Sequence, residues 1–365
     1  MPIPTAWTVS HDFAFVFGGA ERVTTTLLAS VMPGSPLLYL AGSPGVVDHM
    51  TGGGPSAPLL PPKLVTAPSH RFLVAAYPIA LARKPPIEGN LLASSYAFAH
   101  HVRSEGTTVI YCHSPLRQAW SGRRHYATEG RQAERLAVST LGPWLRVRDQ
   151  RAAGRAQLIV ATSRAVRDRI REFYGRDEIP IVPPAIDHGH FHPDQVAKPV
   201  RHVYLWVGRI VEPYKRLSLV IEAMRDDPTR SLVVAGEGRD RARLEAEAPD
   251  NVTFLGWQPS TALAQLYRIS DAVIFPSEDD FGLVPVEAMA CGTPTIAFSQ
   301  GGALDTIEDG VTGLHFHDAT VPGLRKALDH FEGETWDRSR LFEISKRWSA
   351  EAFAASMREI VTTIG

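Results

Sequence analysis

One short segment of a nearly neutral chain concentrates carboxylates among glycines and prolines. It is PSEDDFGLVPVEAMACGTP (Pro276–Pro294). Asp279 lies just before a Phe-Gly pair, and Glu287 lies eight residues further on, where we expect the first turn of a helix. Carboxylates readily accept hydrogen bonds from hydroxyl groups, including the vicinal hydroxyls of a ribose or a hexose. The chemistry indicated is therefore the recognition of polyols.

A phosphate site is expected beside these carboxylates. The apolar run DAVIFP predicts a strand that leads into a loop and then into a helix, with Pro285 suited to the first turn and Gly292 to the end. Amides at a helix N-terminus bind phosphate. The amides that would lie free there are those of Gly282, Leu283 and Val284. A diphosphate flanked by two polyols describes a nucleotide sugar.

The same block resembles the acidic-x7-Glu motif of retaining glycosyltransferase family 4, whose members have the GT-B fold. The stretch FGLVPVEAMACGTPTIA follows the family pattern, and GGALDTIEDGVTG continues it, with Asp305 where Glu is commoner. The resemblance implies that Glu287 holds the ribose diol of a donor. It also implies that Asp279 and the backbone of Phe281, Gly282 and Leu283 hold the transferred sugar.

The first acidic position of the motif departs from the family, which has Glu where this chain has Asp279. Glu278 stands one residue earlier, so two assignments remain open. We favour Asp279, because Phe281 and Gly282 should fix the register of the loop and a slip would displace the phosphate-binding amides.

Two further motifs resemble the donor side of the family. VGRIVEPYKR contains Arg209 just past a predicted strand and Lys215 at the start of the next helix. The resemblance implies that they clamp the diphosphate, and two fixed cations can offset the charge that builds on a departing nucleoside diphosphate. VAGEG, with Gly236 and Gly238, and VTFLGW, with Leu255, resemble the loops on the nucleobase side.

The first half of the chain carries two motifs of the same family. FVFGGAERV contains Gly18 and Gly19 and resembles the N-terminal glycine-rich loop that approaches the donor phosphate and the acceptor. It fails as a dinucleotide fingerprint, since the third spaced glycine is missing. IYCHSPLRQAW places His113 at the end of a predicted strand, where the family has its active-site histidine near the transferred sugar.

A metal site is suggested by HGHFH (His188, His190 and His192), because alternate residues of a strand share a face. The setting is rich in proline and argues against a regular strand. The GT-B enzymes of this family need no metal for chemistry, and no Asp-x-Asp signature is present. We therefore expect no metal and no cofactor, with the nucleotide-diphosphate sugar as co-substrate.

Short apolar runs alternate with helical periodicity, which is typical of parallel α/β architecture. The predicted strands are 108–113, 157–162, 202–207, 231–236, 271–276 and 293–298. Between them lie helical stretches such as KRLSLVIEAM, with Leu217, Ile221 and Met224 on one face. The segment 179–199 has no periodicity and is interpreted as a hinge. We expect the GT-B architecture, with two Rossmann-like parallel α/β domains facing a cleft.

The domains expected are 1–184, binding the acceptor, and 185–345, binding the nucleotide sugar. We expect 346–365 to form one helix, RWSAEAFAASMREIVTTI included, that crosses back to the N-terminal domain.

Composition favours a cytoplasmic protein. The first residues lack a signal-peptide pattern, no run of 18 apolar residues occurs, and the only two cysteines, Cys112 and Cys291, lie in apolar settings.

Positive charge is concentrated in one part of the chain. Residues 101–175 hold 14 Arg and 6 acidic residues, a balance of 14 − 6 = +8, although the whole chain carries −1. One interpretation is a solvated surface; the other is an anionic partner, such as a phosphorylated carrier or the inner face of the membrane. No nucleic-acid recognition motif accompanies the arginines.

The function expected is a retaining transfer of a hexose from a nucleotide-diphosphate sugar to a hydroxyl of a glycan, lipid-linked or small-molecule acceptor. The motifs look most like polysaccharide or O-antigen mannosyltransferases, so GDP-mannose is the first donor to consider and a UDP-hexose the second. Two alternatives remain: another GT-B enzyme, such as a phosphorylase or nucleotide-sugar epimerase, and an inactive nucleotide-sugar-binding module.

Overall fold

The computed structural model describes residues 7–63, 65–66, 73–117, 119–120, 132–194 and 202–365, with the backbone alone for 132–140. The chain divides into two compact units. The N-terminal unit comprises residues 1–185 together with Ala350–Gly365, and the C-terminal unit comprises Ile186–Ser349. None of the described helices combines the length and the apolar content needed to cross a membrane.

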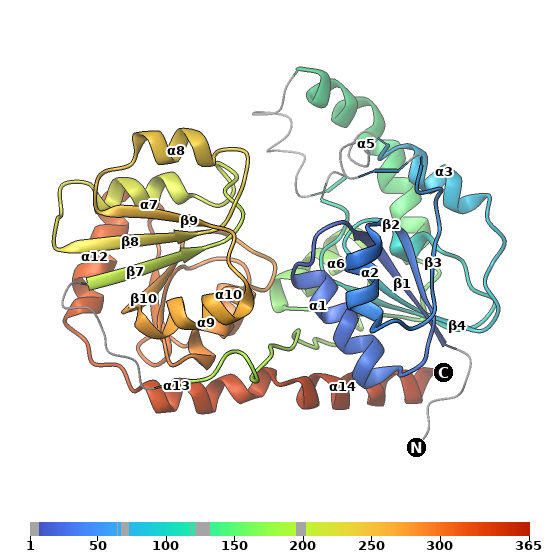
Figure 1. Ribbon diagram of the computed structural model, residues 1–365. Helices are drawn as coiled ribbons and strands as arrows, with labels where there is room; N and C mark the ends of the chain where they lie inside the picture. The colour runs from blue at the N-terminus through green and yellow to red at the C-terminus, as the bar shows by residue number, and fades with distance from the viewer. Residues whose placement is uncertain (1–6, 64, 67–72, 118, 121–131, 195–201) are drawn as a thin grey trace. The chain divides into compact units, whose positions relative to one another are not determined.

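The N-terminal unit is a parallel sheet of six strands in the order β3-β2-β1-β4-β5-β6 (Figure 1). Its strands are β1 (Trp7–Ala14), β2 (Leu37–Gly42), β3 (Ser56–Pro58), β4 (Asn90–Ser95), β5 (Thr108–Cys112) and β6 (Leu158–Ala161). Its helices are α1 (Gly19–Thr26), the π-helical turn η1 (Leu27–Val31), α2 (Pro44–Thr51), α3 (Ala76–Ala82), the short turn η3 (Ala99–His101), α5 (Gln132–Ala153), α6 (Arg164–Tyr174) and α14 (Ala350–Ile364).

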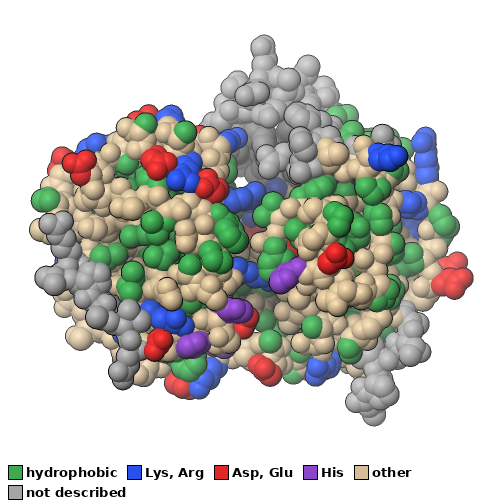
Figure 2. All heavy atoms as spheres, viewed as in Figure 1, with side chains coloured by type: hydrophobic (Ala, Val, Ile, Leu, Met, Phe, Trp, Pro, Cys, Tyr) green, Lys and Arg blue, Asp and Glu red, His purple; other side chains and the backbone are tan. Residues whose placement is uncertain are grey.

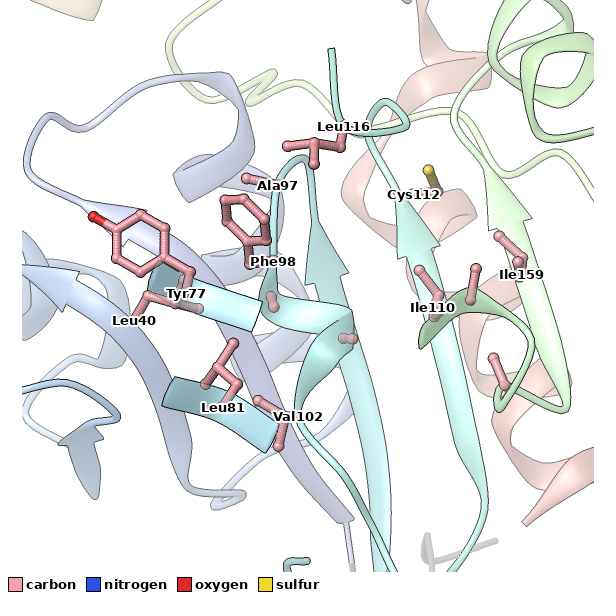
Figure 3. Close-up of a cluster of buried hydrophobic side chains, with 14 of the residues drawn as sticks. Leu40, Tyr77, Leu81, Ala97, Phe98, Val102, Ile110, Cys112, Leu116 and Ile159 are labelled. Carbon is pink, nitrogen blue, oxygen red and sulfur yellow. The ribbon is translucent and has the colours of Figure 1, made fainter. Parts of the chain in front are cut away.

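Two apolar layers cover this sheet, because successive strand residues point to opposite faces. Figure 3 shows the layer over one face, where Tyr77 of α3 lies beside Phe98, the residue before η3; Ile110 and Cys112 of β5 belong to the same cluster. On the other face α1, η1 and α14 pack over Val9, Leu92 and Tyr111; the buried residues of α14 are Phe353, Ala354, Met357 and Val361.

The C-terminal unit repeats the design, with strand order β12-β11-β10-β7-β8-β9. Its strands are β7 (His202–Val207), β8 (Arg230–Ala235), β9 (Val252–Gly256), β10 (Ala272–Phe275), β11 (Thr295–Phe298) and β12 (Gly313–Phe316). Its helices are α7 (Leu217–Met224), α8 (Arg241–Glu247), α9 (Ser260–Ile269), α10 (Leu283–Ala290), α11 (Ala303–Thr306), α12 (Val321–Glu332), α13 (Arg338–Ser345) and the turn η4 (Lys346–Trp348). Helices α7 and α12 cover one face of the sheet, and α9, α10 and α13 cover the other.

The predicted α/β architecture is confirmed. All six predicted strands are present, with ends within two residues of the expected ones. Leu217, Ile221 and Met224 are buried on one face of α7, and both cysteines are buried and free. The part of the predicted hinge that the structure describes, 179–194, contains no helix or strand beyond a single bridge at Ile181. Residues 195–199 of that hinge lie outside the described residues.

The prediction of one uninterrupted C-terminal helix was wrong. Ser349 has extended backbone angles (φ −73°, ψ 159°) between η4 and α14. Trp348 is buried in the apolar core of the C-terminal unit, and its carbonyl oxygen accepts a hydrogen bond of 2.9 Å from the Ile186 N–H. The chain is therefore held in one core before Ala350 begins a helix that packs in the other.

Charges on the visible face of the C-terminal unit are balanced by neighbours. Figure 2 shows acidic and basic side chains side by side over α8, where Arg241 pairs with Glu237 and Glu245, and Arg243 with Glu247. Exposed pairs of this kind contribute about 0–1 kcal/mol to stability, so we interpret this face as a solvated surface.

Candidate active site

The predicted donor residues gather at one edge of the C-terminal sheet. Strand β7 lies between β10 and β8, so the strand order reverses beside β7, and ligands of open parallel sheets bind at the carboxyl ends of the strands around such a point. Arg209 and Lys215 follow β7, Gly236 follows β8, and Asp279 follows β10. The fold therefore places these residues where a ligand site is expected.

The loop after β10 ends in an open helix N-terminus. Gly282 is the residue before α10, and its φ of +87° is one that glycine adopts without strain. The N–H groups of Gly282, Leu283 and Val284 form no hydrogen bond with any described residue. Three unpartnered amides at a helix N-terminus suit an anion, and the phosphate itself stays a prediction. Pro285 lies in the first turn of α10, and Gly292 (φ +74°) follows its end, both as predicted.

A second loop fixes the register of this segment. Gly302, after β11, donates its N–H to the Asp279 carbonyl oxygen at 2.8 Å. A Cβ on Gly302 would lie 2.1 Å from the Phe281 carbonyl oxygen, so only glycine allows this approach. The sequence pointed to Phe281 and Gly282 as the residues that set the register, and the structure adds backbone contact with Gly302.

Lys215 and Asp279 form an ion pair that the sequence did not predict. The Lys215 Nζ lies 2.8 Å from Asp279 Oδ1 and 2.5 Å from Oδ2. The two side chains are 13% and 20% exposed, so water screens the pair only in part. The neighbouring Glu278 is exposed. Asp279, rather than Glu278, is therefore the acid that lies against the candidate diphosphate clamp. Lys215 itself lies two residues before α7, not within its first turn.

The other predicted donor residues lie at or just after the ends of β7, β8 and β9. Arg209 is exposed and has no polar partner among the described residues. A Cβ on Gly236 would lie 1.8 Å from the Gly208 carbonyl oxygen, so the two loops touch through their backbones. Leu255 belongs to strand β9 rather than to a loop, which corrects the prediction, and it is 40% exposed beside Trp257 at 69%. Strand β9 is an edge strand of the sheet, and Trp257 lies just after its end.

Glu287 lies further along its helix than predicted. It is the fifth residue of α10, and therefore in the second turn, because the helix begins at Leu283. The residue is 4% exposed, and its Oε2 accepts a hydrogen bond of 2.9 Å from the hydroxyl of the buried Tyr267. The tyrosine therefore fixes the direction of one carboxylate oxygen, a contact that no spacing in the sequence indicated.

The N-terminal motifs meet around β1, β4 and β5. Gly18 and Gly19 begin α1 shortly after β1, and His113 directly follows β5. The strand order reverses between β1 and β4, so this edge is the corresponding ligand position of the N-terminal sheet. The Gly18 N–H donates to Glu21 Oε2 at 2.9 Å, which fixes the glycine-rich turn to its own helix.

A chain of side-chain hydrogen bonds connects this turn to His113. The nitrogen His11 Nε2 lies 3.4 Å from Glu21 Oε1, and His11 Nδ1 lies 3.0 Å from Thr24 Oγ1. Thr24 Oγ1 lies 2.8 Å from Ser94 Oγ, which lies 2.8 Å from His113 Nε2. Sequence reasoning missed His11, Glu21, Thr24 and Ser94. The spacing Gly18-x-x-Glu21, typical of a helix start, was the one available signal.

The buried His101 and the half-buried His113 should make the fold sensitive to acid. Burial, with a smaller contribution from the nearby His11, lowers the pKa of His113 to about 3. Burial also lowers the pKa of His101 to about 4, although hydrogen bonding to Asp149 opposes the shift. Between these values and about 6.5 the unfolded chain binds more protons than the folded one.

We therefore expect the free energy of unfolding to fall as the pH is lowered, by about 2 kcal/mol per histidine between pH 7 and pH 5. Urea unfolding at both pH values measures the loss. His113→Gln should reduce it, whereas His330→Gln, on an exposed side chain, should leave it unchanged. Equal losses in His113→Gln and the wild type would contradict the assignment.

The three histidines of the hinge each contact a different group. His188 Nε2 contacts Ser345 Oγ at 3.0 Å, His190 Nδ1 contacts Asp187 Oδ2 at 2.6 Å, and His192 Nδ1 contacts the Pro193 carbonyl oxygen at 3.0 Å. Residues 188–190 form a turn, so the alternation of a strand does not apply to them.

A different group, His100, His101 and Asp149, has ligating atoms within 4.8 Å of one another and is the one candidate metal cluster among the described residues. His100 and His101 lie 3.0 and 3.4 Å from Asp149 Oδ1, while Trp120 and Tyr174 donate to Oδ2 at 2.7 and 2.8 Å. Burial alone would raise the pKa of Asp149, but the histidines hold it well below its ordinary value. Four hydrogen-bond donors surround the Asp149 carboxylate, so we interpret Asp149 as a structural residue that connects η3, α5 and α6.

Two sheets of six parallel strands with helices on both faces define the GT-B class, and solved structures share this fold. HepE of Anabaena in complex with UDP-glucose matches with a TM-score of 0.73 at 18% identity, over 98% of this chain and 100% of that one. Sucrose-phosphate synthase from Thermosynechococcus elongatus matches with a TM-score of 0.71 at 19% identity, over 98% of both chains.

Residues 190–352 match the family model described as Glycosyl transferases group 1, a range that covers most of the C-terminal unit. Similar proteins are D-inositol 3-phosphate glycosyltransferases. That of Actinosynnema mirum is 33% identical over 238 residues, 52% of this chain and 57% of the relative. That of Nocardia farcinica is 34% identical over 235 residues, 55% and 51% of the two chains. The chain thus spans about half the length of these relatives.

Proposed function

We propose that the protein is a retaining glycosyltransferase that moves a hexose from a nucleotide-diphosphate sugar to a hydroxyl acceptor. The observation that carries the proposal is the set of unpartnered amides at Gly282, Leu283 and Val284, on a loop whose Asp279 contacts the cation of Lys215. Amides and a cation suit a diphosphate, and the match of this unit to a glycosyltransferase family supports the assignment.

In this mechanism Arg209, Lys215 and the N-terminus of α10 bind the diphosphate and stabilise its charge as it departs. Asp279 and the Phe281–Leu283 backbone hold the donor sugar, while Glu287 holds the ribose diol. The departing phosphate oxygen takes the proton of the acceptor hydroxyl on the same face of the sugar, so that the anomeric configuration is kept. Gly18, Gly19 and His113 act on the reacting groups from the N-terminal unit, and Gly236 and Leu255 act on the nucleobase side.

Sequence motifs, structural neighbours and charge bear on the donor and the acceptor. GDP-mannose is the donor that the sequence motifs favour, and the structural neighbour solved with UDP-glucose gives equal reason to test a UDP-hexose. An anionic acceptor suits the basic balance of residues 101–175. The similar proteins are named for D-inositol 3-phosphate, which is such an anion, and this supports an acceptor that carries phosphate.

A thermal-shift panel of GDP-mannose, UDP-glucose, GDP and UDP tests the donor proposal. A ligand present at 100 times its Kd stabilises the folded state by about 2.7 kcal/mol, which raises Tm by several degrees. We expect one nucleotide sugar to raise Tm, and Arg209→Ala to reduce the rise. No shift with any nucleotide sugar at millimolar concentration would contradict the proposal.

Turnover should be independent of added metal. Two side-chain cations and the α10 amides supply the charge stabilisation for which other transferases use a divalent ion. We expect the rate with EDTA to equal the rate without it. A loss of activity that only Mg²⁺ or Mn²⁺ restores would contradict this view and direct attention to His100, His101 and Asp149.

The basic segment should favour anionic surfaces. If its arginines meet a phosphorylated lipid, binding to anionic vesicles should fall steeply between low salt and about 0.15 M salt, where the Debye length is about 8 Å. Co-sedimentation with anionic and neutral vesicles measures this. Equal binding to both kinds would show that the arginines are a solvated surface.

A further inference from the structure

The hydrogen-bond chain in the N-terminal unit has a fixed starting point at Glu21. An ionised carboxylate only accepts hydrogen bonds, so the His11 Nε2 that faces Glu21 Oε1 must carry a proton. In a neutral imidazole the other nitrogen then has a lone pair. His11 Nδ1 is therefore an acceptor and can receive the proton of its neighbour Thr24 Oγ1.

The direction of each following bond is then determined by counting protons. Thr24 has one hydroxyl proton, and its other near acceptor is the Ala20 carbonyl oxygen at 2.9 Å. Whether that proton goes to His11 or to Ala20, none remains for Ser94, so Ser94 Oγ must donate to Thr24 Oγ1. Ser94 has then used its own proton and can only accept from His113 Nε2.

The fold holds these groups in place. Thr24 and Glu21 are three residues apart on α1 and so lie on one face of the helix. His11 of β1 and Ser94 of β4 are directly paired across neighbouring strands. His11, Thr24 and Ser94 are fully buried, so water does not compete for these bonds. The second nitrogen of His113, Nδ1, forms no hydrogen bond with a described residue.

We propose that Glu21 acts through His11, Thr24 and Ser94 as a positioning group that holds His113 in the tautomer with its proton on Nε2. Nδ1 then presents a lone pair and accepts a hydrogen bond from a hydroxyl group of the substrate. The tautomer follows from the hydrogen-bond geometry with Glu21 ionised and His11 neutral, whereas its consequence for catalysis rests on the proposed function. The bond made by one imidazole nitrogen sets the chemistry of the other, and the wrong tautomer of a catalytic histidine can lower kcat by orders of magnitude.

Nitrogen-15 NMR of the histidine-labelled full-length chain tests the tautomer without any substrate. Long-range ¹H–¹⁵N correlations distinguish the nitrogen that carries the proton from the one that does not. We expect His113 in the Nε2–H form in the wild type. An Nδ1–H form in the wild type overturns the proposal.

Two variants of Thr24 isolate the hydroxyl. Thr24→Val keeps the shape and removes the hydroxyl, so that Ser94 is free to donate to His113 Nε2; we expect the ratio of Nε2–H to Nδ1–H to fall about tenfold or more. Thr24→Ser keeps the hydroxyl and should keep the wild-type ratio.

Glu21→Gln is the second test. A glutamine amide can donate a hydrogen bond to His11, so the direction of the hydrogen bonds along the chain is no longer fixed. Unchanged ratios in both Thr24→Val and Glu21→Gln overturn the proposal.

Turnover gives a separate readout. We expect Thr24→Val to lower kcat about 10- to 100-fold with little change in KM, as for other groups that orient a functional histidine, and Thr24→Ser to restore it. The expected tautomers in a chain without transferase activity would refute the proposed function and support the assignment of His113. Transfer activity together with the Nδ1–H form of His113 would support the proposed function and overturn the proposed tautomer.

Discussion

Replacing Lys215 or Arg209 by alanine is expected to lower kcat about 10²- to 10³-fold, the usual cost of removing a group that stabilises charge in the transition state. Nucleotide binding should weaken less than turnover, because the amides of Gly282, Leu283 and Val284 remain. Steady-state kinetics with the donor found in the thermal-shift panel, together with the Kd of the free nucleoside diphosphate, separates the two effects.

The structure also predicts an order between the two variants. Arg209 has no polar partner among the described residues, whereas Lys215 is bound to both oxygens of Asp279. Lys215→Ala therefore removes a cation and also takes the positive charge of Lys215 away from the Asp279 carboxylate. We expect the larger loss for Lys215→Ala. Arg243→Ala, which removes an exposed cation of α8, is the matched control and should keep wild-type kinetics.

Near wild-type turnover in folded Arg209→Ala and Lys215→Ala would show that the diphosphate is bound elsewhere. Equal weakening of nucleotide binding and kcat/KM, with kcat unchanged, would show instead that the two cations contribute only to ground-state binding.

Asp279→Ala should lower kcat/KM by about 2–4 kcal/mol of transition-state stabilisation, while Glu278→Ala should change it by less than about 0.5 kcal/mol. The reason is positional. Both carboxylate oxygens of Asp279 face Lys215, and the Gly302 amide holds the Asp279 backbone, whereas Glu278 is exposed. Measuring kcat/KM for both variants decides which acid fills the first position of the motif.

A double-mutant cycle connects this prediction to the first. Groups in direct contact are not additive, so Lys215→Ala with Asp279→Ala should lose less than the sum of the single losses. Additive losses would show that the ion pair is absent when donor is bound. A disabled Glu278→Ala beside an active Asp279→Ala would reverse the assignment of the two acids.

The sequence predicts those features of the fold that depend on local pattern. Strands buried on both faces read as short apolar runs, which is why β7, β8, β10 and β11 were found close to their true ends. Gly282 and Gly292 were recognisable because a helix start and a helix end each require particular residues. The amides of the α10 N-terminus follow from the same local chemistry.

Contacts between distant segments could not be read from the sequence. Lys215 and Asp279 are 64 residues apart and meet only because β7 and β10 are neighbours in the sheet. Ser94 and Thr24 are 70 residues apart and depend on the pairing of β1 with β4. Glu287 was assigned to the first turn because the motif gives its spacing from Asp279 but not the residue at which α10 begins.

The central claim is a transfer that keeps the anomeric configuration, from a nucleotide-diphosphate sugar bound by the C-terminal unit. The most direct measurement is NMR of the reaction product, where the one-bond coupling between the anomeric carbon and its proton reports the configuration at the transferred carbon. An α-linked donor is expected to give an α-linked product with the wild-type protein, and the rate of product formation is expected to fall at least about 100-fold in Lys215→Ala. A β-linked product would contradict the account. So would a nucleotide sugar that binds but is not consumed over days with any phosphorylated or neutral polyol acceptor.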